Sequence, residues 1–356
     1  MVECKGFQSK QTVLLKVRDL QQDHRLIEQA GEIIRNGGLV AFPTETVYGL
    51  GANALDAKAV TSIFTAKGRP QDNPLIIHIE DACKASQYAR EIPAVYNELC
   101  RRFSPGPLTD ILPKRDIVPK ETSGGLDTVA IRIPSHPVAR EIIRCAGVPV
   151  AAPSANLSGS PSPTCAQHCV RDLWGRVDAI VDAGECSVGL ESTVISLAGE
   201  RPVLLRPGAV TPQMLREILP DLLVHHAVTD KLEAGERADS PGMKYKHYAP
   251  KAQITVLDAD SDTFASYVNS HAGEGVFALC FEEDTAKLKV PFLSLGKDEQ
   301  DQARRLFAAL RELDERGARQ VYARCPGKTG VGLAVYNRLI RAAAYHEYSL
   351  EENNRF

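Results

Sequence analysis

The sequence lacks any run of apolar residues long enough to span a membrane, and its N-terminus has no signal-peptide pattern. We therefore expect a cytoplasmic protein that makes no membrane contact. An excess of positive charge is also absent, since 42 Lys and Arg residues against 45 Asp and Glu residues give a net charge of -3. A protein whose main role is to coat nucleic acid is clearly basic, so this class is disfavoured, although a local basic cleft remains open.

The nine cysteines form no CxxC pair, and their number is odd. This usage predicts reduced thiols, most of them buried as small apolar groups. Cys165, His168 and Cys169 lie close enough in sequence to suggest a metal site. A second cluster of ligands is missing, however, and the spacing of the two cysteines fits one face of a helix. We predict no metal there.

Two catalytic motifs are missing as well. The sequence contains no G-x-S-x-G, so we do not predict that Ser154 is a nucleophile. Residues 326–330 (PGKTG) resemble the second half of a P-loop, but the first glycine that this motif requires would fall on Tyr322. A P-loop is therefore excluded.

The length of 356 residues exceeds the roughly 250–300 residues at which a single core usually divides, so we expect two domains. Alternating strand and helix patterns fill residues 1–222, and the periodicity is lost in the linker, residues 223–250. Residues 251–356 then show a second, shorter alternation that predicts a small Rossmann-like α/β domain. The linker ends in residues 240–250 (SPGMKYKHYAP), which are rich in Tyr and Lys where a passive tether favours Gly and Ser.

Residues 67–78 (KGRPQDNPLIIH) are the stretch around which the first domain is organised. A short helix is predicted from Asp56 to Ala66, with Asp56 as N-cap and with Gly68 and Pro70 ending it. The apolar run at 75–79 predicts a buried strand. Lys67 and Arg69 therefore lie between a helix end and a core strand. Either they complement the helix dipole, or they form a clamp for phosphate, and the stretch alone leaves both readings open.

Other polar residues occur where an α/β sheet would place a ligand. Thr44 and Thr46 follow a strand in a loop predicted at 43–51, and Arg132 lies inside the apolar strand 129–133. A charge in an apolar strand needs a partner or a wet cleft. Because many cations and hydroxyls recur nearby, we favour a ligand-facing Arg132 over an outward-facing one. The loop at 153–162 is dense in hydroxyls and is either an ordinary turn or a nest for phosphate.

Several motifs, taken in order, resemble a known family. They are residues 43–50 (PTETVYGL), 67–70 (KGRP), 73–75 (NPL), 153–159 (PSANLSG), 191–193 (EST) and 205–208 (LRPG), and then 240–244 (SPGMK) and 247–250 (HYAP). Together they resemble a YrdC-type L-threonylcarbamoyladenylate synthase in its long, two-domain form. The motifs span residues from about 39 to 250, whereas the C-terminal unit matches mainly in position and βα pattern.

The resemblance implies a twisted open mixed α/β sheet with a positive concave face for the first domain. It implies a nucleotidyltransferase that converts L-threonine, bicarbonate or CO2, and ATP to L-threonylcarbamoyladenylate and pyrophosphate. The product supplies N6-threonylcarbamoylation of adenosine 37 in tRNA, so the implied partner is a downstream tRNA threonylcarbamoyl-transfer machinery. Weak direct binding of tRNA is left as an open alternative.

The resemblance also implies site residues. Those on the ATP side are Lys67, Arg69, Asn73, Thr128, Ser154, Ser162, Arg206 and Tyr245, with Lys67 and Arg69 carrying the catalytic charge. Those on the threonine side are Thr46, His78, Arg132, Ala152 and Ser192. Mg²⁺ is expected on the phosphates of ATP, with no dedicated protein ligand. Tyr245 lies in the linker, which we therefore interpret as a lid over the nucleotide.

Two other functions are weighed against this one. A double-stranded RNA-binding or ribosome-associated factor would use the concave face for RNA, but the net charge of -3 and the absence of aromatic RNA-stacking motifs disfavour it. A carbamoyltransferase that uses a related domain is the third alternative, and such proteins resemble larger multi-domain chains.

Overall fold

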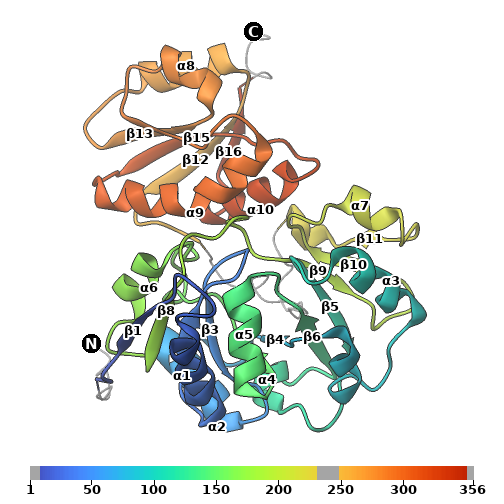
Figure 1. The fold of residues 1–356 in the computed structure, drawn as a ribbon. Coiled ribbons are helices and arrows are strands. Elements are labelled where there is room, and N and C mark those ends of the chain that lie inside the picture. Colours follow the sequence, from blue (N-terminus) through green and yellow to red (C-terminus); the bar gives the residue numbers. More distant parts are fainter. Residues whose placement is uncertain (1–8, 231–247, 351–356) are drawn as a thin grey trace.

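The structure is a computed structural model that describes residues 9–230 and 248–350 and contains two sheets (Figure 1). The strands of the larger sheet are β1 (Val13–Lys16), β2 (Val40–Phe42), β3 (Gly49–Asn53), β4 (Ile76–His78), β5 (Leu108–Pro113), β6 (Thr128–Arg132), β7 (Val150–Ala151), β8 (Ala179–Asp182), β9 (Thr193–Ser196), β10 (Val203–Arg206) and β11 (Leu223–Val224). They lie in the order β1-β8-β2-β3-β7-β4-β6-β5-β9-β10-β11 and form a mixed sheet, as predicted for the first domain.

The smaller sheet is parallel throughout, as expected of a Rossmann-like unit. It contains β12 (Gln253–Asp258), β13 (Val276–Cys280), β14 (Phe292–Ser294), β15 (Gln320–Arg324) and β16 (Glu347–Ser349), in the order β14-β13-β15-β12-β16.

The helices of the larger unit are α1 (His24–Arg35), α2 (Ala57–Lys67), α3 (Ala94–Phe103), α4 (Lys120–Ser123), α5 (Pro137–Ala146), α6 (Ala166–Leu173) and α7 (Pro212–Arg216). Those of the smaller unit are α8 (Ser261–Ser270), α9 (Glu299–Glu315) and α10 (Gly332–Ala342). In Figure 1, α9 and α10 lie on the side of the smaller sheet that faces the larger unit. Within residues 9–230 and 248–350, no helix is both long and apolar enough to cross a membrane.

The predicted organising stretch has the expected local structure. The side chain of Asp56 caps α2 by accepting from the backbone N–H of Lys58 at 2.8 Å. Gly68 ends the helix in the left-handed region, with φ of 62°, which glycine adopts without a Cβ penalty. Strand β4 follows at Ile76 and is buried along its whole length. Lys67 is therefore the last residue of α2, and Arg69 lies in the connection between this helix and β4.

The prediction of a loop at 43–51 is wrong at its C-terminal end, where β3 begins at Gly49. A Cβ on Gly51 would approach the ring of Phe42 to 2.6 Å and Val150 Cγ1 to 2.9 Å. Glycine lets β3 pack closely on its neighbours here, whereas in the sequence the same glycines indicated a turn.

The two units share apolar core. Val47 and Leu190 of the larger unit belong to the same buried cluster as Phe307, Leu310 and the other core residues of α9 and α10. At one edge of the larger sheet β11 pairs with β10, so the first two residues of the predicted linker, Leu223 and Val224, form a strand. The smaller unit therefore packs directly against the larger one.

Candidate active site

The larger unit contains a cavity with about 590 Å³ of empty space, a figure that includes the open solvent at its mouth. His78 and Arg132 end two parallel strands, β4 and β6, and are partners in the ladder. The cavity thus lies at carboxyl ends of strands, where α/β sheets bind ligands. Its walls are Thr44, Thr46, Val47, Gly49, Arg69, Pro74, Leu75, Ile76, His78, Arg132, Ala152, Pro153, Ser154, Glu191, Ser192, Arg206 and Tyr248.

A buried ion pair lies in one wall. Arg132 and Glu45 approach to 2.7 Å, between Arg132 Nη2 and Glu45 Oε1, and their side chains are 5% and 7% exposed. Beside them His78 is 2% exposed, and burial, with Arg132 second, lowers its pKa to about 3. The imidazole is therefore neutral at neutral pH. Its Nδ1 has no hydrogen-bond partner in the part of the chain that the structure describes.

A second wall is formed by Arg206 and Ser192. Arg206 donates from Nε to the Ser192 carbonyl at 2.9 Å and from Nη2 to Ser192 Oγ at 3.1 Å. The Ser192 hydroxyl also lies 2.8 Å from Thr109 Oγ1. Burial, and then the nearby charge of Arg338, lower the pKa of Arg206 to about 10, so the guanidinium keeps its charge at neutral pH. Its position fixes both the backbone and the hydroxyl of Ser192.

Glu191, next to Ser192, is held from two sides. Its Oε1 accepts from Ser162 Oγ at 2.5 Å, and its Oε2 accepts from Arg338 Nε at 3.0 Å. Burial alone raises the pKa of this carboxyl, but Arg338, Arg206 and Ser162 outweigh it, and the net shift is downward. Glu191 is therefore an ionised carboxylate in the cavity wall, and one of its partners comes from the smaller unit.

Lys67 lies behind the wall. It is 3% exposed, and its ammonium donates to the carbonyls of Ser154 and Asn156, the latter at 2.6 Å. Burial, with Arg69 second, lowers the pKa of Lys67 well below its ordinary value. Lys67 thus orders the 154–156 loop, whose Ser154 lines the cavity.

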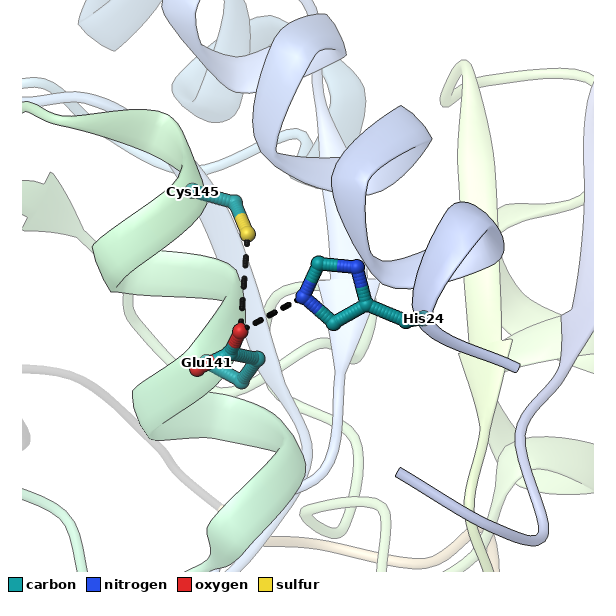
Figure 2. Close-up of side chains that lie close together, drawn as sticks. All are labelled: His24, Glu141 and Cys145. Carbon is teal, nitrogen blue, oxygen red and sulfur yellow. Dashed lines mark hydrogen bonds and ion pairs between the residues drawn. The ribbon is translucent and has the colours of Figure 1, made fainter. Parts of the chain in front are cut away.

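Figure 2 shows His24, Glu141 and Cys145, which could in principle hold a metal between α1 and α5. His24 Nε2 lies 2.8 Å from Glu141 Oε1, and Cys145 Sγ lies 3.9 Å from the same oxygen. Arg144, however, already donates to both oxygens of Glu141, at 2.9 Å and 2.5 Å. A cation would have to displace this guanidinium, so the cluster is better explained as an ion-pair network.

Comparison with known proteins identifies the family. One family model, described as "Telomere recombination" and covering Sua5, YciO and YrdC, matches residues 32–208, and the model "Threonylcarbamoyl-AMP synthase, C-terminal domain" matches residues 210–344. A threonylcarbamoyl-AMP synthase of Pyrococcus abyssi is 44% identical over 94% of this chain and 98% of its own length. The chain belongs to the two-domain threonylcarbamoyl-AMP synthase family.

Two further relatives agree with this family. The threonylcarbamoyl-AMP synthase of Bacillus subtilis is 43% identical over 91% of this chain and 95% of its own length. A crystal structure of Pyrococcus abyssi Sua5 complexed with L-threonine superposes with a TM-score of 0.87, at 42% identity, over 95% of this chain and 99% of that one.

Within this synthase fold, the residues predicted on the threonine side all line the cavity, namely Thr46, His78, Arg132, Ala152 and Ser192. Arg69, Ser154 and Arg206 from the ATP side line it too. Ser162 is fully buried, and its hydroxyl donates to Glu191, which lines the cavity. Thr128 lies at the opposite end of β6 from Arg132, in a separate hollow with Asp127 and His225. Tyr245 lies outside the described residues.

Asn73 is 2% exposed, and neither atom of its amide has a hydrogen-bond partner within the described ranges. Burying an amide without hydrogen-bond partners costs free energy, so a ligand that forms hydrogen bonds with the Asn73 amide would bind more tightly.

The sequence interpretation missed three residues of the synthase site. Glu45 and Glu191 lie inside the quoted motifs, but no role was assigned to them, because their arginine partners are distant in sequence. Tyr248 lines the cavity and contacts Phe307 of α9, with ring centroids 5.0 Å apart. The aromatic content of the linker marks this segment, but the resemblance selects Tyr245 within it rather than Tyr248.

Proposed function

We propose that this chain makes L-threonylcarbamoyladenylate and pyrophosphate from L-threonine, bicarbonate or CO2, and ATP. The observation that carries the proposal is a cavity lined by Arg69, Arg132 and Arg206 together with threonine and serine hydroxyls. Guanidinium groups in a buried site need anionic partners, and the substrates supply a carboxylate, a carbamate and a triphosphate. The hydroxyls add neutral hydrogen bonds that suit a small polar amino acid.

The reaction needs no protein nucleophile. The amine of threonine captures CO2 as a carbamate, a carbamate oxygen attacks the α-phosphorus, and pyrophosphate leaves. Positioning and charge neutralisation are the catalytic requirements, which arginines and ordered hydroxyls meet. In this proposal Arg132 binds the threonine carboxylate, neutral His78 bonds a polar group of threonine, and Arg69 and Arg206 bind phosphates.

Mg²⁺ would be held by the phosphates of ATP. Glu191 is bonded to Arg338 and Ser162. The charge of Glu45 is balanced by Arg132 at 2.7 Å, although neither Glu45 oxygen has a hydrogen-bond partner within the described residues. These residues fit a cation brought by the nucleotide better than one with its own protein ligands. When bound, the ion would neutralise charge on the departing pyrophosphate.

We further propose that Lys67, Asn73, Thr128, Ser162 and Tyr245 complete the ATP side. In the linker 223–250, between domains 1–222 and 251–356, we propose that residues 240–250 close over the nucleotide. Lys67 and Ser162 would act from behind the wall, through the 154–156 loop and Glu191. The product would pass to a tRNA threonylcarbamoyl-transfer machinery in the cytoplasm.

The direct test is pyrophosphate release from ATP by the full-length protein, with threonine or bicarbonate omitted in turn. We expect release to depend on both. Valine is the matched control substrate, because it keeps the shape of threonine without the hydroxyl. Release that continues unchanged after either omission would exclude the proposed reaction.

A further inference from the structure

Arg338 connects the smaller unit to the cavity. It lies on α10, is fully buried, and is the largest such side chain in the described ranges. From there it donates to Glu191 Oε2 at 3.0 Å, to the Glu191 carbonyl at 3.2 Å and to the Pro207 carbonyl at 2.5 Å. Burying an arginine is costly unless its charge and N–H groups are satisfied, and these contacts across the domain boundary satisfy it.

The two segments that Arg338 joins form one side of the cavity. Glu191 and Ser192 belong to the first segment, and Arg206, directly before Pro207, belongs to the second. Arg206 closes the connection by donating to the carbonyl and the hydroxyl of Ser192. Each guanidinium is a planar fork that fixes two acceptors at once, so the pair sets the spacing of the two segments.

The charged side chains of Arg338, Glu191 and Arg206 alternate in sign. Glu191 lies between Arg338 and Arg206, and both arginines stabilise its ionised form. If Arg338 were removed, Arg206 would be the remaining cation beside a buried carboxylate. The attraction at low dielectric would draw Arg206 toward Glu191 and away from Ser192. Ser192 would then lose the two hydrogen bonds that Arg206 donates to its carbonyl and hydroxyl. The guanidinium of Arg206 would pair with Glu191 and no longer face the substrate.

We propose that Arg338 of the smaller domain is a positioning residue for the reaction: it engages Glu191 so that Arg206 stays on Ser192 and faces the substrates. Arg338 itself touches no substrate. The inference rests on the proposed function and gives the smaller domain a part in the chemistry of the larger one.

The test compares Arg338→Met with Arg341→Met in the full-length chain. Arg341 lies one turn further along α10, is 7% exposed, and also crosses to the larger unit, where it donates to the Ala227 carbonyl at 2.6 Å. Ala227 does not line the cavity. We expect Arg338→Met to raise the KM and the calorimetric Kd for L-threonine at least tenfold, and Arg341→Met to change them less than twofold.

Two more variants keep the test decisive. Arg338→Lys keeps the charge but loses the fork, so it should fold even if Arg338→Met does not, and it should raise the threonine KM several-fold. In Glu191→Gln, the carboxylate that attracts Arg206 is gone, so adding Arg338→Met there should weaken threonine binding much less than it does in the wild type.

The outcomes are distinguishable. Wild-type threonine KM and Kd in both Arg338 variants, or strict additivity of the Glu191 and Arg338 effects, would overturn the positioning role while leaving the synthase reaction intact. A wild-type protein that releases no pyrophosphate with threonine and bicarbonate would instead contradict the proposed function itself.

Discussion

Replacing Arg132, first alone and then together with Glu45, separates threonine binding from folding. It is buried, lies 2.7 Å from Glu45 and lines the cavity, where we propose that it binds the threonine carboxylate. Arg132→Gln removes a charged hydrogen bond to the substrate, which contributes about 1.5–3 kcal/mol. We therefore expect the Kd for L-threonine to rise about 10- to 100-fold.

The same change leaves Glu45 buried without its partner. Breaking a buried pair in this way typically destabilises a protein by about 3–5 kcal/mol. The double variant Glu45→Gln/Arg132→Gln removes both charges and should recover most of that stability without recovering threonine affinity. Urea denaturation at pH 7 measures the first quantity, and titration calorimetry measures the second.

A matched control exists in α9. Arg311 and Asp172 form another buried pair, with side chains 9% and 11% exposed and contacts of 3.1 Å and 2.7 Å, and neither lines the cavity. Arg311→Gln should lose comparable stability and still bind threonine as the wild type does. Threonine affinity within twofold of wild type in folded Arg132→Gln would refute the assignment of Arg132.

Three further outcomes are expected. Arg69→Ala should lower pyrophosphate release at least tenfold, about 1.4 kcal/mol. Lys67→Ala should lower both release and stability, because Lys67 holds the 154–156 loop. Normal turnover in Arg69→Ala would exclude the proposed phosphate contact. His78 has a pKa lowered to about 3 and Asp110 a pKa raised to about 7, both by burial first. The free energy of unfolding of His78→Gln, relative to wild type, should therefore rise as pH falls below about 6.5. That of Asp110→Asn should rise as pH increases above about 4, and each change is at most about 1.4 kcal/mol per pH unit. Parallel pH profiles of variant and wild type in denaturant melts would contradict this. Serine should react less efficiently than threonine by about 10- to 100-fold in kcat/KM, since one methyl group contributes roughly 1–3 kcal/mol, and valine should be worse; equal constants for threonine and valine would exclude a bond to the hydroxyl.

Local chemistry made much of the fold predictable. Asp56, Gly68 and the apolar run at 75–79 specify a capped helix, its end and a buried strand within one short stretch, and the structure confirms all three. The loop predicted at 43–51 overlaps the first three residues of β3, because the glycines there allow close packing on Phe42 and do not form a turn. That packing depends on neighbouring strands, which a local pattern does not contain.

The site was predictable only in part for a related reason. The position of Arg132 in an apolar strand indicated a cleft, and the structure places it in the cavity wall. Its partner Glu45 comes from another segment, and Glu191 meets Arg338 across 147 residues of sequence. Such long-range ion pairs follow from sheet order and domain packing, so no spacing rule reveals them.

The central claim is tested most directly by following carbon from bicarbonate into the product. The full-length protein is incubated with ATP, Mg²⁺, L-threonine and ¹³C-bicarbonate, quenched rapidly, and examined by mass spectrometry. The account predicts a threonine-dependent adenylate that carries one ¹³C atom and forms in step with pyrophosphate. Pyrophosphate release without a labelled adenylate, or an adenylate of threonine that contains no label, would contradict it.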